Sequence, residues 1–235
     1  LGYEWSGQTH RGGDHNIYFL DDEGELRHSA PSAKHPAWDA ANGQVTEDRD
    51  IRETIAAFGE REIMVVPHIG GRAANLAFHD PRVMPMLEVH SCHRSYDDAL
   101  RGALNRGVRI GFIGGSDDHR GAIGDSHPCA RDRFYASHSG LLAVYADDLT
   151  REALWRAFFA RRCYATNGIR SVLDLRLGDI PMGGEGPWPG DDAALHIHLV
   201  CDGWLDRIEV WAGDHLLRDI YNPGKRKVRH YEGDI

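Results

Sequence analysis

Several features that mark common protein classes are scarce or absent in this 235-residue chain. Its four cysteines, Cys92, Cys129, Cys163 and Cys201, are widely spaced and form no Cys-x-x-Cys pair, which excludes zinc-finger and thioredoxin motifs. No apolar stretch approaches the roughly 20 residues that a membrane-spanning helix needs. Reduced, buried thiols, a cytoplasmic location and no membrane partner are therefore the expectation. The N-terminus shows no signal peptide, but a chain that begins inside the fold carries no information about its own export.

Basic residues are also in the minority. The chain has 27 Lys and Arg against 36 Asp and Glu, which gives a formal net charge of -9. A protein that binds nucleic acid by neutralising phosphates needs the opposite balance. The only basic run, residues 225–227 with Arg229, is interpreted as a solvated strand edge. The composition therefore predicts no nucleic-acid partner and leaves the oligomeric state open.

The hydrophobic pattern predicts two regions of different architecture. Up to about residue 166, strand-like and helix-like segments alternate, which is typical of an α/β fold. Helices are expected over residues 50–58, 96–104 and 150–162, the last with Thr150 as its N-cap and an aromatic stripe that packs into the core. With 41% hydrophobic residues, the chain is long enough for one large and one small domain. We therefore assign residues 1–166 to an α/β domain.

From Asn167 onward the apolar residues recur with period two, and no helix pattern is found. Strands are expected over residues 171–177, 194–200, 207–211 and 215–220, with Gly- and Pro-rich turns between them. Residues 167–235 are therefore predicted to form a small antiparallel β module. His196 and His198 share one face of their strand. That spacing suits a metal, but the solvated face of a half-buried strand explains it as well, and this second interpretation is favoured.

The chemistry-bearing residues of the first region follow strand-like runs. Residues 108–113 form an apolar run that Gly114 and Gly115 end, and Asp117 and His119 come directly after it. His68 ends a similar run over residues 62–67, and Glu88 lies inside another over residues 84–90. In parallel α/β folds, sites are built at the carboxyl ends of strands. Glu4 and His15 lie in the same way beside two strands near the N-terminus.

Taken in order, these motifs resemble the polymerase-and-histidinol-phosphatase (PHP) superfamily. The resemblance rests on Gly2-Tyr3-Glu4, His15, Pro67-His68, Leu87-Glu88-Val89 and Ser116-Asp117-Asp118-His119. Residues 14–19, 149–157 and 161–168 are similar to a poorly characterised PHP-like branch, so the resemblance extends over most of the chain.

The resemblance implies a distorted, TIM-like (β/α)7 barrel that holds two or three divalent metal ions and hydrolyses phosphoesters through a metal-bound hydroxide. Glu4 would be a bridging carboxylate, His15 and His68 would complete one metal site with it, and Asp117 and His119 would hold neighbouring ions. The family also has a His-x-His on its first strand and a later Thr-Asp-His. This sequence starts at Leu1, directly before the Gly-x-Glu motif, and both of those earlier motifs are absent from it. We therefore expect the N-terminal strands of the barrel to lie outside this chain.

The remaining roles concern the substrate and the metal. Mixed imidazole and carboxylate ligands suit Zn, Mn or Fe. A small anionic substrate needs further cations, and Arg72 and Arg120 directly follow proposed ligands, with Arg94 as a third choice. Glu88 and His93 are predicted to transfer protons. The alternative for Glu88 is that it holds a ligand histidine.

Two other functions stay open from the sequence. One is an amidohydrolase-like activity on a C–N bond, which a bridging lysine would favour; Lys34, in a loop-like context, is the only lysine before Lys225. The other is a non-catalytic metal-binding PHP-like domain, for which the lack of the His-x-His motif argues. A metal-dependent phosphoesterase is the preferred interpretation.

Overall fold

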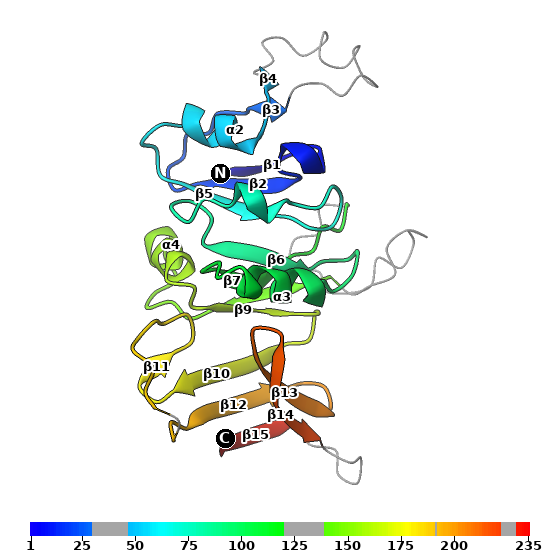
Figure 1. Cartoon of the computed structure of the whole chain (residues 1–235). Coiled ribbons are helices and arrows are strands. Elements are labelled where there is room, and N and C mark those ends of the chain that lie inside the picture. Colours follow the sequence, from blue (N-terminus) through cyan, green and yellow to red (C-terminus); the bar gives the residue numbers. More distant parts are fainter. Residues whose placement is uncertain (30–46, 120–138, 191, 222–228) are drawn as a thin grey trace. The chain divides into compact units, whose positions relative to one another are not determined.

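The computed structural model describes residues 1–29, 47–119, 139–190, 192–221 and 229–235 (Figure 1). The chain divides into two compact units, Leu1–Glu88 and Val89–Ile235. Unit 1 contains β1 (Gly2–Trp5), the 3₁₀ helix η1 (Thr9–Arg11), β2 (His15–Phe19), β3 (His28–Ser29), β4 (Glu47–Asp48), α2 (Ile51–Ala57), β5 (Ile63–Pro67) and η2 (Leu76–Phe78). Strand β6 (Met86–His90) runs across the boundary in the sequence. Unit 2 continues with α3 (Asp97–Asn105), β7 (Gly111–Gly114), β8 (Leu141–Val144), α4 (Arg151–Phe159), β9 (Cys163–Thr166), β10 (Ser171–Leu177), β11 (Ile180–Pro181), β12 (Leu195–Cys201), β13 (Arg207–Ala212), β14 (His215–Tyr221) and β15 (His230–Asp234).

The main sheet of unit 1 is antiparallel, not parallel as the α/β pattern led us to expect. Its strand order is β1-β2-β5, with Trp5 opposite His15 and His15 opposite Pro67. The short connection between β1 and β2 contains only η1 and cannot hold a crossover helix, so β2 returns directly beside β1. The start of β2 therefore lies next to the end of β5, and this register places His15 beside the segment that leads to His68.

One face of this sheet carries the core of unit 1. Ile17 and Val65 are fully buried and pack with Trp5, Phe19 and the apolar face of α2. The rings of Phe19 and Phe58 meet edge to face with 5.3 Å between their centroids. Such close packing holds the strand ends, and therefore the histidines at those ends, in fixed positions.

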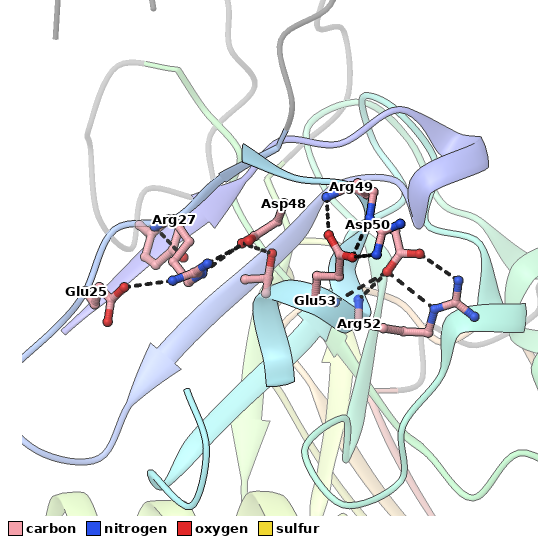
Figure 2. Close-up of polar contacts among 9 residues, drawn as sticks. Glu25, Arg27, Asp48, Arg49, Asp50, Arg52 and Glu53 are labelled. Carbon is pink, nitrogen blue, oxygen red and sulfur yellow. Dashed lines mark hydrogen bonds and ion pairs between the residues drawn. The ribbon is translucent and has the colours of Figure 1, made fainter. Parts of the chain in front are cut away.

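A network of charged side chains anchors the start of α2 (Figure 2). The buried Asp48 carboxylate accepts bonds from Arg27 Nε (2.8 Å) and Nη2 (2.7 Å), and from Thr54 Oγ1 at 2.7 Å. Asp50 is the N-cap, because its side chain accepts bonds from the backbone N–H groups of Arg52 and Glu53. This cap confirms the helix start predicted from the sequence.

In unit 2, strands β7, β8 and β9 lie close together, and this close approach requires a glycine at position 114. A Cβ atom at Gly114 would lie 2.9 Å from the carbonyl oxygens of both Leu141 and Thr166, so no other residue fits there without a shift. The two helices agree with prediction: α3 precedes β7, and α4 begins after Thr150, whose hydroxyl accepts a bond from the Ala153 N–H. The Gly114-Gly115 break thus fixes where β7 ends and the Asp117 loop begins.

The C-terminal strands match the predicted period-two pattern. β10, β11, β12 and β15 form an antiparallel sheet in the order β11-β10-β12-β15, and β13 pairs with β14 as a hairpin. The domain boundary predicted at residue 166 stays a prediction. Within the part of the chain that the structure describes, the strands form six small sheets and none closes into a barrel, so the fold shown is mixed α/β. No helix in the same part is long and apolar enough to cross a membrane.

Candidate metal centre

Unit 1 holds a buried imidazole–carboxylate pair. His68 follows β5 directly, and its Nδ1 lies 2.8 Å from Oε1 of Glu88 in β6. Both side chains are almost fully buried. A carboxylate that accepts the Nδ1 proton fixes the ring orientation and leaves Nε2 as the basic nitrogen, which is how metal-ligating histidines are usually held. This contact favours the alternative in which Glu88 orients a ligand histidine.

His15, at the start of β2, is buried next to this pair. Its Nδ1 lies 3.0 Å from the Gly13 carbonyl oxygen. Burial is the main cause that lowers the pKa of His15 to about 4; the hydrogen bond to Gly13 opposes this shift, and the neighbouring His68 adds to it. Gly13 has a φ of +83°, and a Cβ atom there would lie 2.3 Å from the Ala73 carbonyl oxygen, so only glycine fits. His15 is therefore held by the backbone as a neutral imidazole, the form that binds metals.

A buried donor lies beside His15. Trp5 packs against the His15 ring with 6.3 Å between centroids, and Trp5 Nε1 is buried without a hydrogen-bond partner among the described residues. A buried indole N–H normally finds an acceptor, and its lack of one is a reason to look for a bound ligand, water or ion. Because an indole N–H can only donate, this position suits an acceptor such as a water or an anionic group and is not evidence for a bound cation.

Asp14 is a residue of this site that sequence reasoning missed. Its side chain is buried and accepts bonds from the Gly7 N–H, the Arg72 N–H and Arg72 Nε. The backbone of Asp14 also accepts a bond from the His68 N–H at 2.9 Å. Asp14 therefore ties the loop after His68 to the start of β2. The only signal in the sequence is its place after Gly12-Gly13.

Glu4 and Arg72 are placed differently from what the ligand set implies. Glu4 is exposed and lies opposite Asn16, on the face of the sheet away from Trp5 and His15. Its Oε1 lies 3.5 Å from Ser6 Oγ. Arg72 is half-exposed and paired with Asp14. The structure thus brings His15, His68 and Glu88 into one neighbourhood of unit 1, with Glu4 on the other face.

Unit 2 holds a second cluster, just after β7. His93 Nε2 lies 2.6 Å from Asp117 Oδ2, and His119 Nε2 lies 2.9 Å from Asp117 Oδ1. The two rings meet edge to face with 6.2 Å between centroids. Asp117 and His119 have φ values of 46° and 54°, a left-handed conformation that costs free energy in residues with side chains. Such strain is common where a loop holds functional side chains.

The buried thiol of Cys92 supports this loop. Its Sγ donates to the Asp117 carbonyl oxygen at 2.7 Å, and the Cys92 N–H donates to the Ser116 carbonyl oxygen at 3.1 Å. His93 is therefore fixed to the loop by the residue before it. Sequence reasoning gave His93 a proton-transfer role, whereas the structure places it in contact with Asp117, as a potential ligand. Arg120 lies outside the described residues.

The donor atoms in both units fit divalent transition metals. Imidazole nitrogens with one carboxylate are ligands that Zn²⁺, Mn²⁺ and Fe²⁺ accept, whereas Mg²⁺ and Ca²⁺ prefer all-oxygen sites. In unit 2, the Nε2 atoms of His93 and His119 each contact one oxygen of the Asp117 carboxylate, so imidazole and carboxylate donors of this kind lie side by side.

Comparisons with known proteins place the chain beside uncharacterised relatives. Residues 127–178 match a family described as a protein of unknown function (DUF3604). An uncharacterised protein of Chlamydia pneumoniae is 33% identical over 123 residues, which are 50% of this chain and 19% of that protein. One of Chlamydia trachomatis is 32% identical over 135 residues, 55% of this chain and 21% of that protein. The matches thus span about a fifth of the length of these curated relatives.

One solved structure is also similar. It is a two-domain protein of Bacteroides vulgatus described as containing a predicted PHP-like metal-dependent phosphoesterase. The match covers 100% of this chain and 74% of that chain, with 14% sequence identity and a TM-score of 0.48. The comparisons therefore give relatives without an assigned activity, and the chemistry has to be argued from the residues of this chain.

Proposed function

We propose that this chain belongs to a metal-dependent hydrolase of the PHP type, a phosphoesterase that acts on a small anionic molecule. The observation that carries the proposal is the His93–Asp117–His119 cluster directly after β7. The imidazoles of His93 and His119 each contact the Asp117 carboxylate there, and Asp117 and His119 lie on a loop held in a strained conformation. The motif resemblance in the sequence predicted Asp117 and His119 for this role.

Each unit supplies its own ligands in this proposal. His15 and His68 bind metal in unit 1, and Asp117 and His119, joined by His93, bind metal in unit 2. Glu4 stays a proposed ligand, to be tested by its own variant because it is exposed here. The distorted (β/α)7 barrel stays a proposal for the whole protein, since the described strands of this chain form six separate sheets. When bound, a divalent ion held by these residues would lower the pKa of a bound water toward 7 and polarise a phosphoryl oxygen.

The other residues orient a ligand histidine or bind the anionic substrate. Glu88 holds His68 by its 2.8 Å contact and acts as a positioning residue. Asp14 fixes Arg72 through Nε, which gives the guanidinium a set direction for bonding a phosphate oxygen. Arg120 is proposed as the second cation. The buried His15 stays neutral at physiological pH, which avoids one positive charge beside the metal.

Metal content and hydrolysis test this proposal together. The purified chain is supplied with Zn²⁺, Mn²⁺ or Fe²⁺, dialysed, and analysed for bound metal and for hydrolysis of a chromogenic phosphomonoester. We expect Asp117→Asn and His68→Ala each to lose bound metal and hydrolysis. The matched control is Asp206→Asn, which removes an exposed carboxylate in another part of unit 2 and leaves both unchanged.

The possible results separate the remaining functions. Equal metal content in wild type and Asp117→Asn would contradict the proposed ligands. If the wild type binds metal, Asp117→Asn loses it, and neither hydrolyses the phosphoester, the non-catalytic metal-binding domain is favoured. Hydrolysis of a chromogenic anilide in place of the phosphoester would favour the amidohydrolase-like activity. A Glu4→Ala variant with unchanged metal content would remove Glu4 from the ligand set.

A further inference from the structure

A group of histidines and carboxylates lies on one face of the β11-β10-β12-β15 sheet, and the proposed hydrolase chemistry does not use it. β12 and β15 are adjacent antiparallel strands (Figure 1). His198 pairs directly with Glu232, and His230 lies two residues before Glu232, so all three side chains point to the same face. The register alone therefore brings two imidazoles and one carboxylate together.

The distances within this group suit a shared cation. One ligand atom from each of His198, His230 and Glu232 lies within 4.8 Å of the others. His230 Nε2 and Glu232 Oε2 are 3.7 Å apart. Two ligands bound about 2.1 Å from one Zn²⁺ ion lie at most about 4.2 Å apart, so this pair already has a suitable spacing. His198 and His230 meet edge to face with 5.3 Å between ring centroids.

The other polar side chains of this face have separate partners. His196 Nδ1 lies 2.9 Å from Asp234 Oδ1 in the next row of the sheet. On β10, Asp174 is opposite His198, but its Oδ2 accepts a bond from Arg176 Nε at 3.2 Å. Because these neighbouring side chains form their own pairs, His198, His230 and Glu232 make up a separate group on this face of the sheet.

We propose that His198, His230 and Glu232 bind a divalent transition-metal ion, with Zn²⁺ as the best match to two imidazoles and one carboxylate. Three protein ligands leave a fourth position for water, as in zinc sites that are not closed by the protein. The ligands come from β12 and β15, so the ion joins the last strand of the chain to its neighbour. Bound Zn²⁺ therefore stabilises the pairing of β15 in the sheet.

The first test is a Zn²⁺ titration of the 235-residue chain by equilibrium dialysis, with NMR of the histidine ring protons. We expect the His198 and His230 resonances to shift when Zn²⁺ is added, and no such shift with Mg²⁺, which prefers oxygen ligands. His198→Ala should lose about one Zn²⁺ equivalent per chain. Glu232→Gln keeps the size of the side chain and should weaken this site at least tenfold, a readout that remains if His198→Ala folds poorly.

Two further variants make the test specific. His215→Ala removes an exposed imidazole on β14, outside the sheet that carries the cluster, and should leave Zn²⁺ binding unchanged. His119→Ala removes a ligand of the proposed hydrolase site and should leave the His198 and His230 shifts intact. The inference is overturned if Zn²⁺ leaves those two resonances unmoved, or if His198→Ala binds as much Zn²⁺ as His215→Ala. Either result leaves the hydrolase proposal standing, because that proposal depends on Asp117 and His68.

Discussion

The β1-β2-β5 sheet and the β11-β10-β12-β15 sheet are both antiparallel, yet they bury their side chains very differently. In the first, Trp5, Ile17, Val65 and Val66 are at most 1% exposed. Among the described residues of the second, Ile197 is the one buried apolar side chain, at 2%. The same backbone arrangement therefore supports a packed core in unit 1 and a mostly half-exposed sheet in unit 2.

This difference decides what the histidines on each sheet can do. His15 and His68 are buried, held by backbone and carboxylate contacts, and thus pre-positioned for chemistry. His198 and His230 are more accessible and are brought together by strand register alone. A buried site gains precision from packing, whereas an exposed site tolerates substitution and yields a weaker, more adaptable metal site.

The largest effect is expected from removing the buried charge of Asp48 in unit 1. Asp48→Ala leaves Arg27, whose side chain is 17% exposed, without its main partner. Breaking a buried ion pair from one side costs about 3–5 kcal/mol of unfolding free energy. This loss is measured by denaturant unfolding, with tryptophan fluorescence as the signal. Asp174→Ala removes a carboxylate paired with Arg176 on β10 and should cost about 0–1 kcal/mol; equal losses would contradict the comparison.

The two sheets should also differ in their response to lost apolar volume. Ile17→Ala leaves a cavity in the core of unit 1 and should lower the unfolding free energy by about 3 kcal/mol. Val172→Ala on β10, where the side chain is 51% exposed, should change it by no more than about 0.5 kcal/mol. The same unfolding experiment compares them. A large loss for Val172→Ala would show that the β10 sheet is covered in solution.

A third variant asks whether Glu88 positions His68 or transfers protons. Glu88→Gln should weaken metal binding by about 10- to 100-fold, because a carboxylate that orients a ligand histidine also raises its basicity. A competition titration with a chelator measures the affinity. Asp234→Asn changes the exposed carboxylate beside His196 and serves as the control. If Glu88→Gln instead keeps its metal affinity and loses turnover, Glu88 is a proton-transfer residue.

The smallest effect concerns the N-cap of α2. The Arg52 guanidinium and the backbone N–H groups at the helix start hold the pKa of Asp50 below its ordinary value. The folded pKa is lowered, so the stabilisation is complete above the unfolded-state value near 3.8 and is lost as the pH falls through the folded one. Asp50→Ala should therefore cost about 1 kcal/mol at pH 7, and this cost should shrink as the pH falls toward 2. An undiminished cost at pH 2, measured by denaturant unfolding, would rule out the charged carboxylate as its origin.

Local structure was largely predictable from the sequence. Strand β10 was predicted at residues 171–177 and is found there, α2 lies within the predicted residues 50–58, and α4 starts after its predicted cap, Thr150. Apolar periodicity and capping residues act over a few neighbouring positions, so they can be read without knowing the fold. The placement of His68 after β5 and of Asp117 after β7 followed from the same local signals.

Side-chain partners were not predictable in the same way. Asp14 and Arg72 are 58 positions apart in the sequence, and His68 and Glu88 are 20 apart. Nothing local marks Asp14 as the carboxylate that fixes Arg72, or His93 as a neighbour of Asp117. The exposed position of Glu4 depends on which face of β1 is packed, and a shift of one residue in register would reverse it.

Local sequence signals were enough to predict helices α2, α3 and α4 and strands β10, β12, β13 and β14. They also placed histidines and carboxylates at strand ends and put His196 and His198 on one face. Only the tertiary structure decided that β1, β2 and β5 are antiparallel, that Glu88 contacts His68, and that His230 and Glu232 join His198. The reason is physical. Propensity and periodicity act between neighbours in the chain, whereas strand pairing and burial are set by the free energy of packing segments that are distant in sequence.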